Sequence, residues 1–406
     1  MDVVYPHCAG LDVHKETLVV CVRHRQPNGT HRSEVRTFGT MTGDLKQLGD
    51  WLAQEGVTIA AMESTGVYWK PIWNLLEGRL QLMLVNAQHV KQVPGRKTDV
   101  KDCQWLAELL EHGLLKASFV PETDLRQLRD LTRGRSTLMA DKARVANRIQ
   151  KILEDANIKL ASVATDVLGA SGRAMIKALI DGQQDPKVLA DLAQSRLCGK
   201  KVQLQQALQG HVTDHHRFML RMLLSQTEAL ERQIEAYEAR MEQVMNPFVR
   251  QAIERIDPIP GISRQGAIAL LAEIGPDMTR FPTGDHLCSW AGMSPGNNQS
   301  GGKRKPGRLK PGNRWLNALL DQLAWAASRK KGSFFQARYR RLAPRRGLSF
   351  TLSERWYALR NRYYRWKRRR AARKFEVYMR SQGRTVKFDG QGRQIDEDAD
   401  DKKRWN

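Results

Sequence analysis

The sequence predicts an α/β domain with a mixed sheet, followed by regions that are almost entirely helical. Three observations support this fold class. Over residues 8–115, short apolar and β-branched runs alternate with helical patterns. From residue 122 to 250, apolar residues recur at helical spacing instead. A third block, residues 254–330, carries turn signals such as Pro295-Gly296, so we expect a compact, mostly helical domain there.

The N-terminal elements follow one another in a recognisable order. Two apolar runs and a third strand across a Pro-Asn-Gly turn come first, then a helix from Thr42 to Gly56 and a buried strand that ends at Glu63. A short helix, a strand and a helix that begins around Thr98 complete the series. Three strands, a helix, a strand, a helix, a strand and a helix is the order of a ribonuclease-H-like domain. We expect the strands at residues 8–13, 17–22, 33–38, 57–62 and 80–85 and the short helix at 68–76.

The helical middle of the chain contains a heptad pattern. Apolar residues alternate at steps of three and four, with one polar position, which predicts a seam that packs against a partner helix. A helical hairpin within one chain and an interface between two chains explain the pattern equally well. The seam positions are Leu220, Leu223, Thr227, Leu230, Ile234, Tyr237, Met241 and Val244.

Composition points to a nucleic-acid partner. The chain has 406 residues, with 67 Lys and Arg against 43 Asp and Glu, a formal net charge of +24. A basic protein binds phosphate backbones by releasing counterions. Five scattered cysteines without CxxC spacing argue for a reducing cytosol and against a disulfide scaffold or zinc ribbon. With no signal-peptide pattern and no long apolar run, we expect a cytoplasmic, nucleoid-associated protein without membrane contact.

Four carboxylates lie where chemistry is expected. Asp12 and Glu63 end two predicted strands, and Asp99 and Asp102 are three apart on a helix. Singly, each reads as a turn, a cap or a first-turn helix acid. Together at one rim of a sheet they repel, and two Mg²⁺ ions are the natural compensation. Such a pair of ions can assist an in-line phosphoryl displacement, so the sequence favours a metal site.

The block after residue 254 carries a second set of candidates. The turn at Pro260-Gly261 before a helix is similar to a helix-hairpin-helix turn, whose backbone N–H groups hold phosphate, although most Pro-Gly turns are structural. Ser300 precedes a glycine- and lysine-rich loop. A serine there is usually a solvated loop residue, yet such a loop supplies the close approach and the cations that a hydroxyl nucleophile needs at phosphate. Ser294, followed by a proline, is the rival and ranks lower.

Several motifs in order resemble the transposases of the IS110 family of bacterial insertion sequences. The motifs are GLDVHK at 10–15, AMESTGVYW at 61–69, GRKTDVKD at 95–102 and the stretch 258–308, and the resemblance covers about residues 5–346. It implies an N-terminal RuvC-like domain with a DEDD tetrad on Asp12, Glu63, Asp99 and Asp102, and a nucleophilic serine at Ser300. Gly261 and the loop cations would hold nucleic-acid backbone: Lys303, Arg304, Lys305, Arg308 and Lys310.

The resemblance also implies a mechanism and partners. Family members cut and rejoin DNA through a phosphoserine intermediate, in a composite site between protomers of an oligomer. A structured guide RNA, the bridge RNA, pairs with donor and target DNA. On residues alone two alternatives stay open. A RuvC-like junction nuclease would hydrolyse DNA with the carboxylates only, and a non-catalytic nucleic-acid-binding protein would need the charge only.

Four regions result from this organisation. We expect a DEDD domain at residues 1–120, a helical or coiled-coil region at 121–250, a serine-bearing domain at 251–346 and an atypical tail at 347–406. The tail departs from the family, because it replaces a closing apolar helix with a basic-aromatic segment and an acidic end. It is either an RNA-binding extension or unrelated sequence read through a junction, and its abrupt onset favours the latter.

Overall fold

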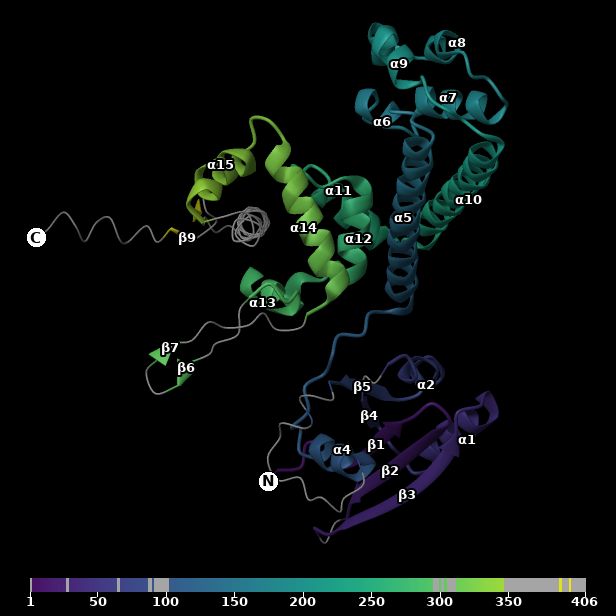
Figure 1. Cartoon of the computed structure of the whole chain (residues 1–406). Helices are drawn as coiled ribbons and strands as arrows, with labels where there is room; N and C mark the ends of the chain where they lie inside the picture. The colour runs from purple at the N-terminus through teal and green to yellow at the C-terminus, as the bar shows by residue number, and fades with distance from the viewer. Residues whose placement is uncertain are drawn as a thin grey trace, which may run out of the picture. The chain divides into compact units, whose positions relative to one another are not determined.

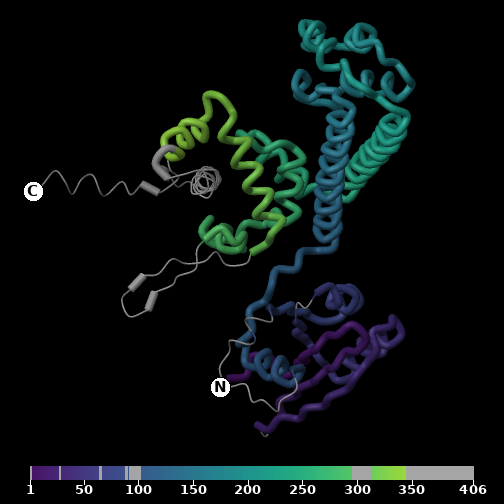
Figure 2. Tube along the Cα trace, in the orientation of Figure 1, coloured from purple at the N-terminus to yellow at the C-terminus, as the bar shows by residue number. Residues whose placement is uncertain are grey.

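The computed structural model divides the chain into two units, Met1–Pro121 and Glu122–Asn406 (Figures 1 and 2). The structure describes residues 2–26, 29–63, 66–86, 90, 102–294, 299–300, 303–304, 312–346, 387–388 and 394–395. Among these residues, no helix is both long and apolar enough to cross a membrane.

The first unit contains a mixed five-stranded sheet in the order β3-β2-β1-β4-β5. The first three strands pair antiparallel, whereas β4 joins β1, and β5 joins β4, in parallel. This confirms the predicted mixed sheet, and the arrangement is consistent with a ribonuclease-H-like fold. The strands are β1 (His7–Val13), β2 (Thr17–Arg25), β3 (His31–Gly39), β4 (Ile59–Glu63) and β5 (Gln81–Val85).

Helices cover both faces of this sheet. On one face, α1 (Thr42–Gln54) and α2 (Trp69–Leu76) bury leucines against Leu11 and Val20. On the other, α4 (Asp102–Glu111) packs against Cys8 and Ile59. Successive strand residues point to opposite faces, so the uninterrupted apolar runs that predicted buried strands supply both layers.

The second unit begins with a long helical hairpin. Helices α5 (Thr123–Asp155) and α10 (Asp214–Val244) pack along each other. Ion pairs join Arg135 to Glu238 and Lys142 to Glu231, so the two helices run antiparallel. A small helical tip connects them, formed by α6 (Leu160–Val163), α7 (Ala170–Ile180), α8 (Pro186–Asp191), η1 (Ser195–Lys200) and α9 (Lys201–Ala207).

The heptad seam is used inside the chain. Leu220, Thr227, Ile234 and Met241 are buried, and the hydroxyl of Thr227 donates to the carbonyl of Leu223 at 2.9 Å. Burying the polar Thr227 therefore costs little folding free energy, since its hydroxyl forms a hydrogen bond within the helix. Of the two interpretations of the pattern, the intramolecular hairpin is the one that the structure adopts.

A C-terminal helical bundle completes the described part of the second unit (Figure 1). Leu125 and Leu128 of α5 belong to its core, together with Leu271 and Leu320. Its elements are α11 (Pro247–Ile256), α12 (Arg264–Ile274), η2 (Met278–Arg280), α13 (Gly284–Trp290), the short strands β6 (Gln299–Ser300) and β7 (Lys303–Arg304), α14 (Arg314–Arg329) and α15 (Phe334–Arg346). Two further two-residue strands, β8 (Lys387–Phe388) and β9 (Gln394–Ile395), pair with each other.

Candidate active site

Asp12 and Glu63 lie side by side at one edge of the sheet. Strands β1 and β4 pair in parallel with Leu11 opposite Met62. Asp12 and Glu63 are the next residue along each strand. Because parallel strands present their carboxyl ends at the same edge, both carboxylates stand at the rim where the apolar core ends.

Helix α4 brings Asp102 towards the same edge. Its first residue is Asp102, while the carbonyl of its last residue, Glu111, accepts hydrogen bonds from Val4 and Tyr5 just before β1. The helix therefore runs opposite to β1, and its N-terminal end lies towards the carboxyl end of that strand. Arg23 of β2 fixes the other end of the helix, with its Nε 2.9 Å from Glu111 Oε2.

A glycine makes this close packing possible. A Cβ on Gly10 would lie 2.2 Å from the carbonyl oxygen of Cys103 and 2.5 Å from the amide nitrogen of Ala107. No side chain fits there without moving the helix. Gly10, two residues before Asp12, thus determines how near the start of α4 comes to β1.

The Asp12 carboxylate has one histidine neighbour. His14 Nε2 lies 3.2 Å from Asp12 Oδ2, and the Asp12 side chain keeps 23 % of its surface exposed. The sequence interpretation gave His14 no role. The spacing of Asp12 and His14 could have predicted this contact, because residues two apart in an extended segment face the same side.

The side chains at this edge offer the type of donor atom that magnesium binds. Carboxylate oxygens of Asp12, Glu63 and Asp102 are the hard ligands that Mg²⁺ prefers. Over the residues that the structure describes, no three His, Cys, Asp or Glu side chains form a group that could hold a metal ion. Asp99, the fourth predicted ligand, lies outside the described residues. The three described carboxylates thus share an edge, and the complete ligand set stays a prediction.

Ser300 is the last residue of β6, in a short β-hairpin. It pairs with Lys303 of β7, and Gln299 pairs with Arg304. The backbone therefore sets the candidate nucleophile directly across from a lysine position. Ser294 lies at the start of this loop, just before residues 295–298, which are outside the described residues. Lys305, Arg308 and Lys310 lie outside the described residues, so their contact with nucleic acid stays a prediction.

The segment between Gly292 and Gly312, which we call the serine loop, has its two ends held together mainly by backbone contacts. A Cβ on Gly312 would lie 2.3 Å from the amide nitrogen of Gly292. The amide of Asn313 donates to the Trp290 carbonyl at 3.4 Å, and Asn317 Nδ2 donates to the Ala291 carbonyl at 3.1 Å. The two ends of the segment between Gly292 and Gly312 are thereby held together.

A buried carboxylate joins the residue after the serine loop, Asn313, to the long hairpin. The Glu273 side chain, 3 % exposed, accepts hydrogen bonds from Arg133 Nε at 2.7 Å and Nη2 at 2.9 Å. Asn313 Nδ2 donates to the same carboxylate at 2.5 Å, while the Asn313 Oδ1 caps α14. Glu273 therefore connects α5, α12 and the start of α14.

Arg129 strengthens the same junction. It donates from Nε to the Ala272 carbonyl at 3.0 Å and from Nη2 to the Glu273 carbonyl at 2.9 Å, at the end of α12. Burial lowers the pKa of the Arg129 guanidinium to about 10, and the facing Glu273 carboxylate opposes that shift. The sequence interpretation missed this network. A single Glu in the otherwise apolar run of residues 267–274 was the available signal.

Gly261 serves packing in the structure. It has a φ of +92°, and a Cβ there would lie 2.3 Å from the amide nitrogen of Ala327 in α14. The turn between α11 and α12 thus needs glycine for a close approach to α14. Phosphate binding by this turn remains a prediction.

Comparisons with known proteins give the site its context. Residues 9–158 match the family model of the DEDD transposases of IS110 type, described as "Transposase". Residues 253–340 match a second model, described as "Transposase IS116/IS110/IS902 family". A "Probable family 20 transposase" from Pseudomonas aeruginosa is 26 % identical over 283 residues, which cover 68 % of this chain and 72 % of the relative.

Proposed function

The chain belongs to the IS110 family of transposases, and we propose that it cuts and rejoins DNA through a phosphoserine intermediate. The two matched regions together span more than half of the chain. The protein is an enzyme of the DEDD type that binds DNA. The finer mechanism rests on the convergence of β1, β4 and α4 at one edge of the sheet.

Asp12, Glu63, Asp99 and Asp102 hold Mg²⁺ in this proposal and orient the scissile phosphate. Bound magnesium supplies the positive charge that lets these carboxylates share an edge and that withdraws electrons from the phosphate. Helix α4 contributes as well, because an acid at its first turn is stabilised by the helix dipole.

Ser300 is the proposed nucleophile. Its Oγ loses a proton and bonds to phosphorus, and a deoxyribose oxygen leaves that phosphorus and gains a proton. A hydroxyl of the second strand then attacks the phosphoserine and releases the serine. Lys303, across the hairpin from Ser300, is the cation best situated by the backbone pairing to balance the developing charge.

The partners are also proposals. The net charge of +24 supports extensive contact with nucleic-acid backbone, which suits a protein whose sequence choice is delegated to a guide RNA. The family resemblance adds a homo-oligomer with a composite site. Leu220, Thr227, Ile234 and Met241 of the α10 seam are buried within the chain, so in this proposal the assembly uses other surfaces than these residues.

The proposal is tested by trapping the covalent intermediate. Purified protein, Mg²⁺ and RNA transcribed from the flank of its own element are incubated with labelled donor and target DNA. We expect a protease-sensitive protein–DNA adduct on a denaturing gel, lost in Ser300→Ala and retained in the control Ser294→Ala. Cleavage without an adduct would contradict the phosphoserine step and favour the hydrolytic junction nuclease.

Two further outcomes bear on the alternatives. Asp12→Asn should abolish cleavage while leaving DNA binding intact, whereas a non-catalytic binding protein would show no cleavage to lose. A chain that ends at Arg346 tests the tail, most of which lies outside the described residues. If the tail is unrelated read-through sequence, the shortened chain should cut at least as well; if it binds RNA, the shortened chain should bind the RNA less tightly.

A further inference from the structure

A cluster of cations joins the last two helices of the C-terminal bundle. Arg329 ends α14, and Lys330 and Lys331 follow it before α15 begins at Phe334. All three side chains are exposed. We call Arg329, Lys330 and Lys331 the basic turn. From Arg314 to Arg346 the sequence has nine Lys and Arg and one acid, Asp321.

No acid balances the basic turn within the described part of the chain. None of its three cations forms an ion pair there, whereas Arg135, Lys142 and Arg264 of the same unit each have a carboxylate partner. Three adjacent like charges repel one another, so an external anion that spans several residues would stabilise this segment. A phosphate backbone is such an anion.

An exposed aromatic ring stands beside these cations. Phe334, the first residue of α15, is 56 % exposed, although it is a large apolar side chain. Its ring lies 5.7 Å from that of Phe335 in an edge-to-face contact, and Phe335 is fully buried. The position of Phe334 is therefore fixed by its neighbour, and its outer face is open for stacking.

The basic turn also lies next to the turn between α11 and α12. The Ser333 hydroxyl donates to the Ala327 carbonyl at 3.2 Å, which folds the segment 328–333 back onto α14. Gly261 approaches the backbone of the same residue, Ala327. Two turns far apart in sequence thus meet at one place in the bundle. Figure 1 shows its helices α11, α12, α14 and α15.

We propose that the basic turn and Phe334 bind single-stranded nucleic acid. Arg329, Lys330 and Lys331 contact successive phosphates, and Phe334 stacks on an unpaired base. Cations along a backbone and an aromatic platform are the combination by which proteins hold single strands. A duplex would satisfy the cations but would leave the ring without a base face. None of these four residues belongs to the proposed catalytic set, so their binding of nucleic acid can be measured without cleavage.

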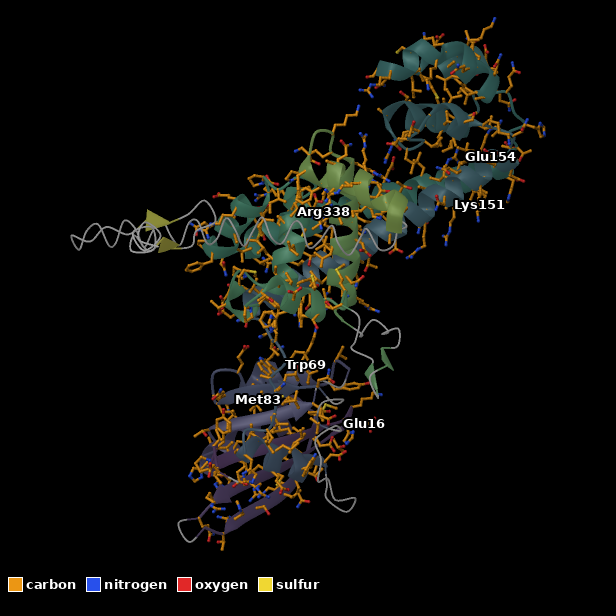
Figure 3. All side chains as sticks on the ribbon, turned by 90° about the vertical axis from the view of Figure 1, so that its left-hand side faces the viewer. Glu16, Trp69, Met83, Lys151, Glu154 and Arg338 are labelled. Carbon is orange, nitrogen blue, oxygen red and sulfur yellow. The ribbon has the colours of Figure 1, made fainter. Side chains whose placement is uncertain are left out.

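The first test measures binding of a fluorescent single-stranded oligonucleotide to the full-length protein in EDTA, over a range of salt concentrations. Neutralising the basic turn (R329A, K330A and K331A together) removes three phosphate contacts, so the slope of log affinity against log salt should fall by about 2. The matched control removes three exposed cations elsewhere in the unit: Arg148→Ala, Lys151→Ala and Lys187→Ala. Lys151 lies on α5 (Figure 3). Equal slopes for the two triple variants would overturn the proposal.

The second test isolates the ring. Phe334→Ala should weaken single-strand binding about fivefold or more and leave binding to a duplex of the same sequence unchanged. Phe218→Ala is the control, because Phe218 on α10 is also 56 % exposed. DNA and RNA strands are compared, and tighter binding of either identifies the strand held here. Equal losses for single strand and duplex, or no loss, would contradict stacking. Since no cleavage is measured, failure of the phosphoserine proposal would not change these results.

Discussion

At the scale of single residues, two glycines decide where functional elements can lie. Gly10 lets α4 approach β1 so closely that a methyl group would meet the Cys103 carbonyl. Gly312 does the same for the two ends of the serine loop. In both places the backbone of one element occupies the space where a neighbouring side chain would be.

Gly10→Ala should therefore disturb the site without touching any carboxylate. Overpacking of this kind typically costs about 1–3 kcal/mol in the free energy of unfolding. Chemical denaturation of the variant measures that cost, and DNA cleavage should fall with it. Gly43→Ala is the control, because nothing lies within 4 Å of a Cβ at Gly43. Equal stability of the two variants would contradict the packing argument.

The cysteines give a second prediction at this scale. Cys198 is exposed, whereas Cys8, Cys21, Cys103 and Cys288 are buried. Burial raises the pKa of Cys8 and of Cys21 to about 12, so neither forms a thiolate near neutral pH. A thiol reagent at pH 8 should modify one cysteine per native chain, and mass spectrometry of peptides should locate it at Cys198. Rapid labelling of Cys8 or Cys21 would contradict this burial.

At the scale of elements, charged groups attach helices to one another. Glu231 of α10 accepts hydrogen bonds from Arg173 of α7, one of them 2.8 Å long, and pairs with Lys142 of α5 at 2.7 Å. These contacts lower the pKa of Glu231 to about 2, chiefly through the Arg173 hydrogen bonds. The helical tip is thereby fastened to the hairpin.

This attachment should depend on pH in a defined direction. The folded-state pKa of Glu231 is depressed, so its stabilisation is fully present above the unfolded value near 4.5 and is lost as the pH falls towards 2. Glu231→Gln should be less stable than the wild type at pH 7, and the difference should narrow at pH 3. Glu235→Gln, on an exposed position of the same helix, is the control. A difference independent of pH would contradict the assignment.

Glu273 provides the strongest prediction for an element junction. Glu273→Gln removes the charge of a buried carboxylate that faces the part-buried Arg129 and Arg133, and breaking a buried pair costs about 3–5 kcal/mol. Glu238→Gln removes a partly exposed pair between α5 and α10 and should cost no more than about 1 kcal/mol. Denaturant titration compares the two. Equal effects would mean that Glu273 does not hold the junction.

Local sequence patterns predicted most strands and helices of the first unit, because the periodicity of a strand or a helix depends on residues that are close in sequence. The Asp12 and Glu63 positions followed from where the apolar runs end. The direction of α4 did not, since it depends on the contact of Gly10 with Cys103 and Ala107, residues far apart in sequence. The heptad likewise predicted a seam but left its partner open. The Glu273 network joins three helices. A single carboxylate in an apolar run indicates a buried charge, but it does not indicate which distant residues pair with it.

At the scale of the whole molecule, cations have two different roles. Many in the long hairpin and tip are paired with carboxylates and fasten helices, as Arg135 and Lys142 do. Those of the basic turn make no such pair in the described residues. The Lys and Arg side chains of the described residues are thus divided between structural ion pairs and surface available to phosphate.

We propose that the edge formed by Asp12 and Glu63 is the metal site of the DNA-cleaving domain. The most direct measurement is a titration with Mn²⁺, followed by electron paramagnetic resonance, as a substitute for Mg²⁺. Asp12→Asn and Glu63→Gln should each weaken metal binding strongly. Glu16→Gln should not, because Glu16 lies in the turn between β1 and β2, exposed (Figure 3). If Asp12→Asn and Glu63→Gln both bind Mn²⁺ as tightly as the wild type, or if Glu16→Gln weakens Mn²⁺ binding as much as they do, this edge is not the metal site.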